Sequence, residues 1–330
     1  MDSIEEFYNK NIRFIDPSKI VDEIIRSIRN DIKTRLKRFG GVVGISGGID
    51  SSVSISLVTK ALGSDSVLGV LLPEKDSNPE SKELALKLAR NLGIQTIEED
   101  ISEALEGFDC YTRRDIAVKS IFPEYDPKTY KMKIGINQTD FNHNLPPVFT
   151  LTIVDPSGQN NSRRLPLKEY LEIVSASNFK QRCRMSMLYY HAERMHYAVV
   201  GTPNKHEINQ GFFVKYGDGG ADLFPIGHLY KNQVCELAEF LDVPQEIIDR
   251  TPTTDTYTAE QSQEEFFYQL PHKELDVIWY GYENNIDPSY MGKILNKTEN
   301  QVKIIYKNME RKNITTEYLR MSPLMYDFNK

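Results

Sequence analysis

Short apolar runs alternate with longer amphipathic stretches along most of the chain. The runs with strand character cover residues 42–45, 67–72, 96–101 and 198–201. Between and around them, apolar residues recur every three or four positions, which predicts helices over residues 15–38, 50–62, 80–92 and 178–197. Strands that are apolar without polar alternation are typical of parallel sheets covered on both faces. The pattern therefore predicts an α/β fold with a doubly wound, Rossmann-like parallel sheet.

The segment from about residue 110 to 177 has a different pattern. Residues 130–136 and 148–154 have strand character, and residues 155–158, Asp-Pro-Ser-Gly, form a strong turn signal after which 163–167 can pair back. We predict a small antiparallel, β-rich insertion in the α/β body. Two interpretations stay open: a decorated loop or oligomer contact, and a lid or substrate-selecting flap.

The remainder of the chain predicts helices packed onto the same body. Amphipathic patterns cover residues 231–241 and 244–250, and residues 287–311 read as two short helices. We expect a single domain over residues 1–330 with a C-terminal helical tail over 286–330. Two helices joined by a turn are also compatible with DNA reading, but packing is favoured by the composition.

Composition narrows the function classes. The 330 residues include 40 basic and 47 acidic side chains, for a net charge of −7, without a long basic block. Nonspecific nucleic-acid binding is therefore not expected. No apolar run is long enough to span a bilayer, and the first ten residues lack a signal core, so we expect a cytoplasmic protein. The three widely spaced cysteines predict free thiols rather than disulfides or a zinc site.

The strand at 42–45 leads into Ser46-Gly47-Gly48-Ile49-Asp50-Ser51-Ser52, which opens the next helix. Glycines at a helix start let amide groups converge on an anion, and the helix dipole favours negative charge there. Hydroxyl groups add donors, and Asp50 is placed to hold Mg²⁺ against phosphates. Neither a Walker Gly-Lys-Ser/Thr nor the Rossmann glycine spacing is present. The phosphate-binding candidates here are Gly44, Ser46, Gly47, Gly48, Asp50, Ser51 and Ser52.

This stretch resembles the pyrophosphate loop of the N-type ATP pyrophosphatases, the PP-loop superfamily with the adenine nucleotide alpha hydrolase-like fold. Those enzymes split ATP between its α and β phosphates. An ordinary Gly-rich turn would leave Asp50 and the flanking serines unexplained.

Three further motifs resemble the ammonia-dependent NAD synthetases. They are the Asn178-to-Met185 run containing Arg182 and Arg184, Gly201-Thr202 with Glu207, and the Lys215-to-Asp222 loop followed by Lys231. The loop departs from the family pattern at Val214, where the family has threonine. A Leu-Pro segment at Leu72 also matches, but the family's nearby arginine is replaced by Lys75.

The resemblance implies a role for each matching position. Leu72, Arg182, Thr202 and Thr253 would contact ATP, and Asp50 with Glu207 would bind magnesium. Lys215 and Lys231 would be catalytic lysines that contact phosphate or substrate. Asp218 and Asp222 would face the nicotinate-bearing half of the substrate or the incoming ammonia, with Arg184 as a further substrate contact. Gln261 to Glu265 resembles an altered form of the family's mobile-loop motif.

The resemblance implies an ATP-dependent amide synthetase. It would adenylate the nicotinate carboxylate of deamido-NAD, release pyrophosphate and form NAD with ammonia. ATP and Mg²⁺ are the expected cofactors, and a homodimer is implied. No glutaminase segment is recognised, so free ammonia or a separate glutaminase is expected, with no nucleic-acid or membrane partner. Two alternatives remain: a paralogue that amidates a different carboxylate, and a nucleotide-binding protein without catalysis.

Overall fold

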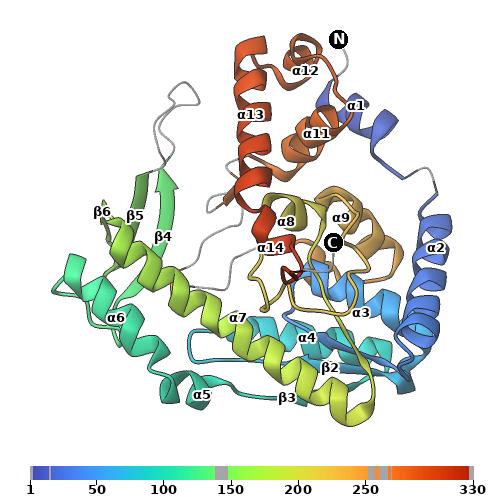
Figure 1. Cartoon of the computed structure of the whole chain (residues 1–330), viewed down its shortest axis with the longest axis horizontal. Coiled ribbons are helices and arrows are strands. Elements are labelled where there is room, and N and C mark those ends of the chain that lie inside the picture. The colour runs from blue at the N-terminus through green and yellow to red at the C-terminus, as the bar shows by residue number, and fades with distance from the viewer. Residues whose placement is uncertain are drawn as a thin grey trace.

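A four-stranded parallel sheet lies at the centre of the computed structural model, which describes residues 3–14, 16–137, 148–251, 257–259, 267–268 and 270–326. The strand order is β3-β2-β1-β7 (Figure 1). The strands are β1 (Gly41–Gly44), β2 (Val67–Leu71), β3 (Gln95–Glu98) and β7 (Ala198–Val200). Gly41 pairs with Val67 on one side and with Ala198 on the other, so these three strands end at the same edge. The predicted α/β parallel sheet is confirmed.

Helices cover both faces of this sheet. One face packs against α2 (Pro17–Asn30), α3 (Ile49–Leu62), α4 (Pro79–Leu92) and α9 (Lys231–Phe240). The other face is covered by the C-terminal half of α7 (Leu167–Met195). Val43 points into the first layer and Val42 into the second, as the alternation of side chains along a strand requires. The doubly wound arrangement is therefore confirmed.

Shorter elements complete the body. They are a π-helical turn (Asp31–Arg35) after α2, a 3₁₀ turn (Ser64–Ser66), α5 (Ser102–Gly107), α6 (Cys110–Ile121), α8 (Lys205–Gln210) and α10 (Gln245–Ile248).

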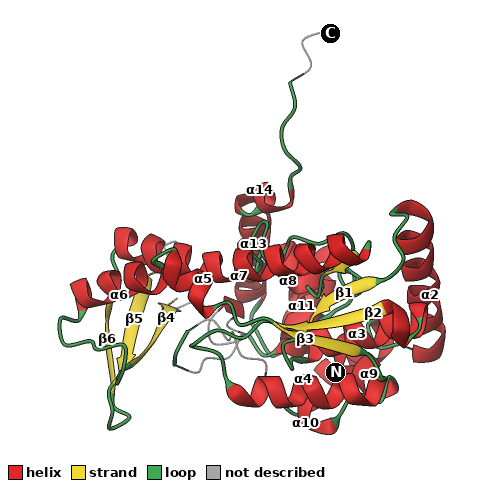
Figure 2. Cartoon of the chain, turned by 90° about the horizontal axis from the view of Figure 1, so that it is seen from below, coloured by secondary structure: helices red, strands yellow, loops and turns green. Residues whose placement is uncertain are grey.

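The predicted antiparallel segment forms a second sheet. Its strands are β4 (Lys131–Asn137), β5 (Val148–Val154) and β6 (Asn160–Arg164), in the order β4-β5-β6. At the turn between β5 and β6, Asp155 accepts backbone hydrogen bonds from Ser157 and Gln159, and Gly158 has a φ of +87°. Figures 1 and 2 show this sheet beside the parallel sheet, with α7 running from one to the other.

Helix α7 begins eleven residues earlier than the prediction of Asn178. It starts at Leu167, directly after Pro166, and its N-terminal half buries Ile173 and Ala176. Nothing at Asn178 breaks the helix, because the apolar spacing continues on both sides of it. The predicted end of the insertion at residue 177 therefore lies inside a continuous helix.

The C-terminal helices form a separate hydrophobic cluster with the N-terminus. This cluster brings α1 (Ile4–Asn11) against α11 (His272–Glu283), α12 (Pro288–Leu295) and α13 (Glu299–Thr315), and α14 (Glu317–Arg320) follows. Trp279 and Met291 are buried at its centre. The α12–α13 pair was predicted. Helices α1 and α11 were not, and α1 has only Phe7 and Tyr8 buried, too few to produce a clear period.

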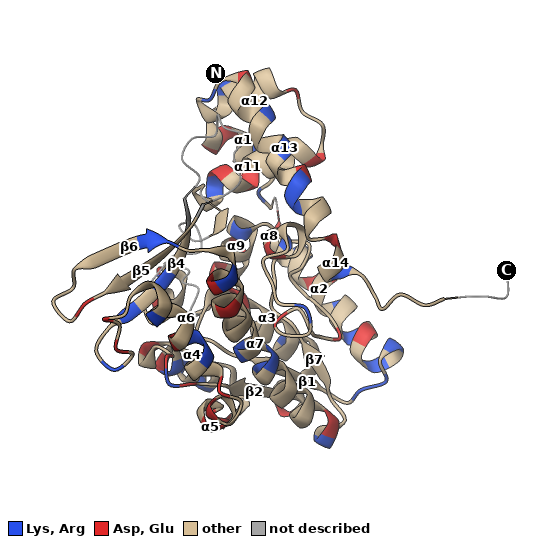
Figure 3. Cartoon of the chain, turned by 60° about the vertical axis from the view of Figure 1, so that its left-hand side comes forward, with Lys and Arg blue, Asp and Glu red and all other residues tan. Residues whose placement is uncertain are grey.

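Two expectations from composition can be compared with the structure. Cys110, Cys183 and Cys235 are free thiols, as predicted. Across the described part of the chain, no helix has the length and apolar character needed to cross a bilayer. Basic and acidic residues are interspersed along the helices (Figure 3).

Candidate active site

The loop between β1 and α3 forms the floor of a large cavity. The Ser51 hydroxyl donates to the Gly48 carbonyl at 2.9 Å and lies 3.2 Å from the Ser46 hydroxyl, while the Gly48 amide donates to Ser46 Oγ at 3.3 Å. Ser52 also donates to the Gly48 carbonyl, at 2.9 Å. Helix α3 has no side-chain cap at its start, so its first amide groups are available to an anion.

Gly47 is the residue whose conformation this loop depends on. Its φ is +71°, and a Cβ atom there would lie 2.3 Å from the carbonyl oxygen of Ser81 in α4. Any other residue would meet both backbone strain and a clash with main-chain atoms. Gly47 and Ser52 shape the loop without lining the cavity themselves.

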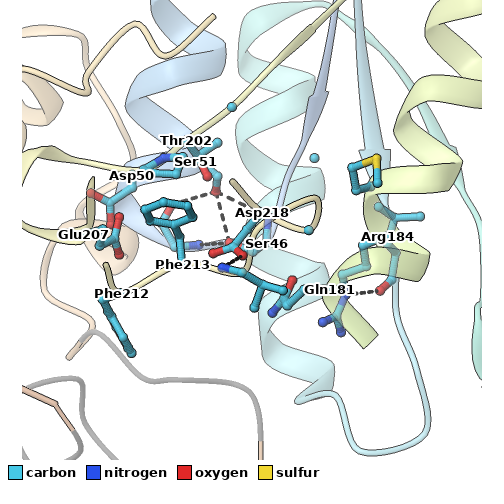
Figure 4. A pocket seen from close by; sticks show the side chains of 18 of the residues that line it. Ser46, Asp50, Ser51, Gln181, Arg184, Thr202, Glu207, Phe212, Phe213 and Asp218 are labelled. Atoms are coloured by element: carbon cyan, nitrogen blue, oxygen red, sulfur yellow. Dashed lines mark hydrogen bonds between the residues drawn. The ribbon is translucent and has the colours of Figure 1, made fainter. Parts of the chain in front are cut away.

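The cavity has a volume of about 660 Å³ and follows the carboxyl ends of the strands. Figure 4 shows its labelled side chains, which come from the β1–α3 loop, α3, α7, α8 and the loops after β7 and α8. Most of the residues proposed from sequence line it: Gly44, Ser46, Gly48, Asp50, Ser51, Leu72, Arg184, Thr202, Glu207 and Asp218. This position, at the strand ends of an open α/β sheet, is where ligands bind in such folds.

Asp50, Asn204, Glu207 and Lys231 form a charged cluster at the base of the cavity. The buried ammonium of Lys231 contacts the Asp50 carboxylate, and Asn204 Nδ2 donates to Asp50 Oδ1 at 3.2 Å. The Asn204 amide donates to Glu207 Oε2 at 2.9 Å. Burial and the charge of Asp50 raise the pKa of Glu207 to about 8. Burial opposes the charge on Lys231, but Asp50 and Glu207 raise its pKa above the ordinary value.

Asp218 lies in the cavity wall on the loop after α8. Its carboxylate accepts a hydrogen bond from the Val214 amide at 2.7 Å. Desolvation by the surrounding protein raises the pKa of Asp218 to about 6, although hydrogen bonds from backbone amides lower it. A carboxylate with this pKa changes its charge close to neutral pH.

Other proposed residues lie outside the cavity lining. Arg182 is exposed and donates to the Lys215 carbonyl at 3.3 Å. Asp222 accepts from the Val199 amide at 2.8 Å and from the Tyr189 hydroxyl at 3.2 Å, which ties its loop to β7. The Lys215 ammonium donates to the carbonyls of Tyr318 and Met321, at 2.7 and 2.9 Å.

Lys231 does not line the cavity, but its ammonium contacts the carboxylate of Asp50, which does. Thr253 and the Gln261–Glu265 motif lie outside the described residues.

A buried ionic network that the sequence motifs did not reveal supports the segment after β2. Glu74 and Asp76 are held by Lys180 from α7, at 3.0 and 2.7 Å, and Arg114 from α6 lies 2.5 Å from Asp76. The Tyr111 hydroxyl donates to Glu74 at 2.7 Å. Leu72, Ser77 and Ser81, on either side of these carboxylates, line the cavity. The network therefore sets the position of one cavity wall.

Known proteins with similar sequences identify the family. The model of the NAD synthase family matches residues 20–120 and 152–320. The chain belongs to the NAD synthase family. It is 44% identical over 311 residues to the NH(3)-dependent NAD(+) synthetase of Mesorhizobium japonicum, covering 94% of this chain and 97% of that one. It is 41% identical to the NH(3)-dependent NAD(+) synthetase of Rhizobium meliloti, covering 94% and 92% of the two chains.

A solved structure shares the fold of this NAD synthase family member. The structure of NMN synthetase from Francisella tularensis superposes with a TM-score of 0.64 at 23% identity, covering 96% of this chain and all of that one. Residues 121–151, which include β4, fall outside the family-model match. The unmatched segment is therefore narrower than the insertion predicted from sequence.

Substitution of Gly47 by alanine tests the loop. We expect Gly47→Ala to raise the KM for ATP at least tenfold, because the added Cβ meets the Ser81 carbonyl and displaces the loop amides. Gly93→Ala is the matched control: its φ is +65°, but a Cβ there meets no atom within 4 Å. The control should lose about 1–2 kcal/mol of stability with an unchanged KM. Equal KM values in the two variants would contradict the assignment.

Substitution of Arg114 tests the ionic network. Arg114→Met leaves the buried Asp76 carboxylate short of a partner and should lower the free energy of unfolding by about 3–5 kcal/mol at pH 7. Lys87→Met, which removes an exposed pair with Glu246, should cost less than about 1 kcal/mol. Denaturant titration measures both.

The Arg114 effect should also depend on pH. Burial acts to raise the pKa of Asp76, but Lys180 and Arg114 bring it below its ordinary value of 3.8. The ionised Asp76 carboxylate therefore contributes its full stabilisation above its ordinary pKa of 3.8, and this contribution is lost as the pH falls through the lowered pKa. The deficit of Arg114→Met should shrink toward pH 3, and a pH-independent deficit would contradict the ion-pair explanation.

Proposed function

We propose that this protein is an ammonia-dependent ligase that makes NAD from deamido-NAD. It activates the nicotinate carboxylate with ATP, releases pyrophosphate, and lets ammonia displace AMP from the adenylate. The observation that carries the proposal is a pyrophosphate-type loop at the floor of the cavity, in a chain 44% identical to an NH(3)-dependent NAD(+) synthetase over nearly its whole length.

The chemistry needs a better leaving group than oxide on the carboxylate, and adenylation provides AMP. No covalent nucleophile from the protein is required. The protein must align the carboxylate oxygen with the α-phosphorus and stabilise charge on the phosphates, which positioning and preorganised donors achieve. The amides at the start of α3 and the hydroxyls of Ser46 and Ser51 line the cavity where phosphates would bind.

Asp50 and Glu207 are suited to a magnesium ion. Asn204 donates hydrogen bonds to both carboxylates. Because the charge of Asp50 contributes to the raised pKa of Glu207, a divalent cation would relieve the repulsion between the two carboxylates. Among the described residues no group of three or more His, Cys, Asp and Glu side chains could hold a metal. The two carboxylates of Asp50 and Glu207 match Mg²⁺, which binds through one or two carboxylates together with substrate phosphates. When bound, the ion would neutralise phosphate charge.

Lys231 keeps the Asp50 carboxylate in place and adds a positive charge under the phosphate site. Lys215 would act as a phosphate ligand only after exchanging the carbonyls of Tyr318 and Met321 for the ligand. Arg184, whose guanidinium donates to the Leu72 carbonyl at 3.2 Å, is the arginine of its motif that lines the cavity. We assign it to the nucleotide or dinucleotide phosphates.

Asp218 is the candidate for handling the ammonium proton. Ammonia attacks as the free base, so ammonium must lose a proton near the acyl carbon. With a pKa of about 6, the Asp218 carboxylate is mainly ionised at neutral pH, and it can bind ammonium and accept a proton.

A homodimer is also proposed. Leu167 and Leu171, one turn apart at the start of α7, are exposed, and a second copy of the chain would cover them.

Two observations favour a second candidate function, in which a related ligase amidates a different carboxylate. Val214 stands where the family motif has threonine, and residues 121–151 lie outside the match to the family model. Val214 lines the cavity, and neither change lies in the phosphate loop.

Turnover with defined substrates distinguishes these functions. The purified chain is incubated with ATP, Mg²⁺, ammonium and deamido-NAD, and NAD and pyrophosphate are quantified. Equal amounts of both products are expected. Pyrophosphate release only with another acid from a panel would favour the second candidate, and ATP binding without turnover would leave a nucleotide-binding protein.

Replacement of Asp50 tests the proposed metal ligand. Asp50→Asn should lower kcat at least a hundredfold, because it removes the charge that would bind the cation and pair with Lys231. Circular dichroism should show an unchanged fold. Asp65→Asn, on the turn before β2, is a control that should keep wild-type activity. A kcat for Asp50→Asn within a few-fold of wild type would overturn the metal assignment.

A further inference from the structure

A short segment near residue 258 pairs with the free edge of the antiparallel sheet. The Met132 amide donates to Thr258 Oγ1 at 2.7 Å, and the Ala259 amide donates to the Met132 carbonyl at 3.0 Å. The Thr258 hydroxyl also lies 3.4 Å from that carbonyl. Because β4 is the edge strand of its sheet, its outward backbone groups can accept such a partner.

Tyr257, the residue before this contact, is fixed on two sides. It is buried in the hydrophobic cluster of the antiparallel sheet, which includes Met132, Ile134 and Leu151. It also makes a side-chain hydrogen bond with Ser177 of α7. Tyr257 and Ser177 both line the cavity of the candidate active site. A residue of the cavity wall is therefore held by a strand outside the parallel sheet.

This wall is distant from the phosphate loop. Tyr170, Val174 and Ser177, in the N-terminal half of α7, line the cavity beside Tyr257. Leu188, farther along the same helix, approaches the position of a Gly44 Cβ to 3.4 Å. Ser177, which bonds to Tyr257, precedes Leu188 by eleven positions, or about 16 Å along a helix axis. The Tyr257 wall therefore faces a different part of the bound ligands from the loop that takes the phosphates.

We propose that β4 is a positioning element for the acid substrate: through Thr258 and Ala259 it holds Tyr257 in the cavity wall that contacts this substrate. The inference rests on the proposed function, which assigns the phosphate loop to ATP and leaves the Tyr257 wall for the acid substrate. It gives residues 121–151, which the family model does not match, a role in substrate binding. Tyr257 is the contact residue, and Thr258 acts only through it.

The test is a double-mutant cycle read by steady-state kinetics. Tyr257→Leu removes the ring but keeps an apolar side chain in the cluster, and Thr258→Val removes the hydroxyl that bonds to Met132. Tyr257→Leu should raise the KM for deamido-NAD about tenfold and Thr258→Val about threefold, with the KM for ATP and kcat within about twofold of wild type. The double variant should match Tyr257→Leu alone, because Thr258 acts through the tyrosine.

Two controls separate positioning from folding. Thr258→Ser keeps the hydroxyl and should restore a KM near that of wild type. Thr152→Val removes an exposed hydroxyl pair with Ser162 elsewhere in the same sheet and should leave both KM values unchanged.

Each contrary outcome has a distinct meaning. An active wild type whose KM for deamido-NAD is unmoved by Tyr257→Leu would overturn the inference alone. A rise in the KM for ATP instead would assign the wall to the nucleotide and also overturn it. Multiplying effects in the double variant would refute action through Tyr257. A wild-type chain that makes no NAD would overturn the proposed function and this inference with it.

Discussion

The contact between the Lys231 ammonium and the Asp50 carboxylate is the interaction on which the rest of the site depends. It joins the first residue of α9 to the first turn of α3, and Asn204 links the same carboxylate to Glu207 on α8. Three helices that start at the carboxyl edge of the sheet are thereby brought to one point. The Lys231 ammonium is buried and needs a charged partner, because apolar side chains cannot compensate for its lost hydration. Removing Asp50 would leave this buried charge unpaired. The cluster is therefore a structural junction at the base of the cavity, where the proposed metal ligands meet.

Local patterns were sufficient to predict the parts of the fold built from neighbouring residues. The strands of the parallel sheet, the Gly47-containing loop and the β5–β6 turn each depend on a few consecutive residues with strong preferences, and all were predicted. The start of α7 differs from the prediction, because the family motif begins at Asn178 but no helix-breaking residue lies there. Helix α1 was missed because its burial depends on α11, more than 250 residues away.

The same distinction applies to the site. Most residues predicted from motif positions line the cavity, since the ends of parallel strands must meet at one edge. The choice between Arg182 and Arg184 required the orientation of α7, and the C-terminal acceptors of Lys215 lie about a hundred residues from it. Lys180 and Arg114 were likewise missed, because their carboxylate partners at residues 74 and 76 are distant in sequence. Pairings of this kind have no local signal.

The two ends of the cavity differ in how freely they can change. The phosphate end is formed by the parallel sheet and by Gly47, where a new side chain would clash with α4. A change there would disturb the loop, the sheet edge and the Asp50 cluster together. The other end is formed by α7, Tyr257 and an antiparallel sheet whose edge strand lies outside the family match. The antiparallel sheet contacts residues 257–259 through a few hydrogen bonds and one hydrophobic cluster, so residues of the sheet can vary while the phosphate end is kept. A ligase built in this way can retain one activation chemistry while the peripheral segment adjusts which acid is held beside it.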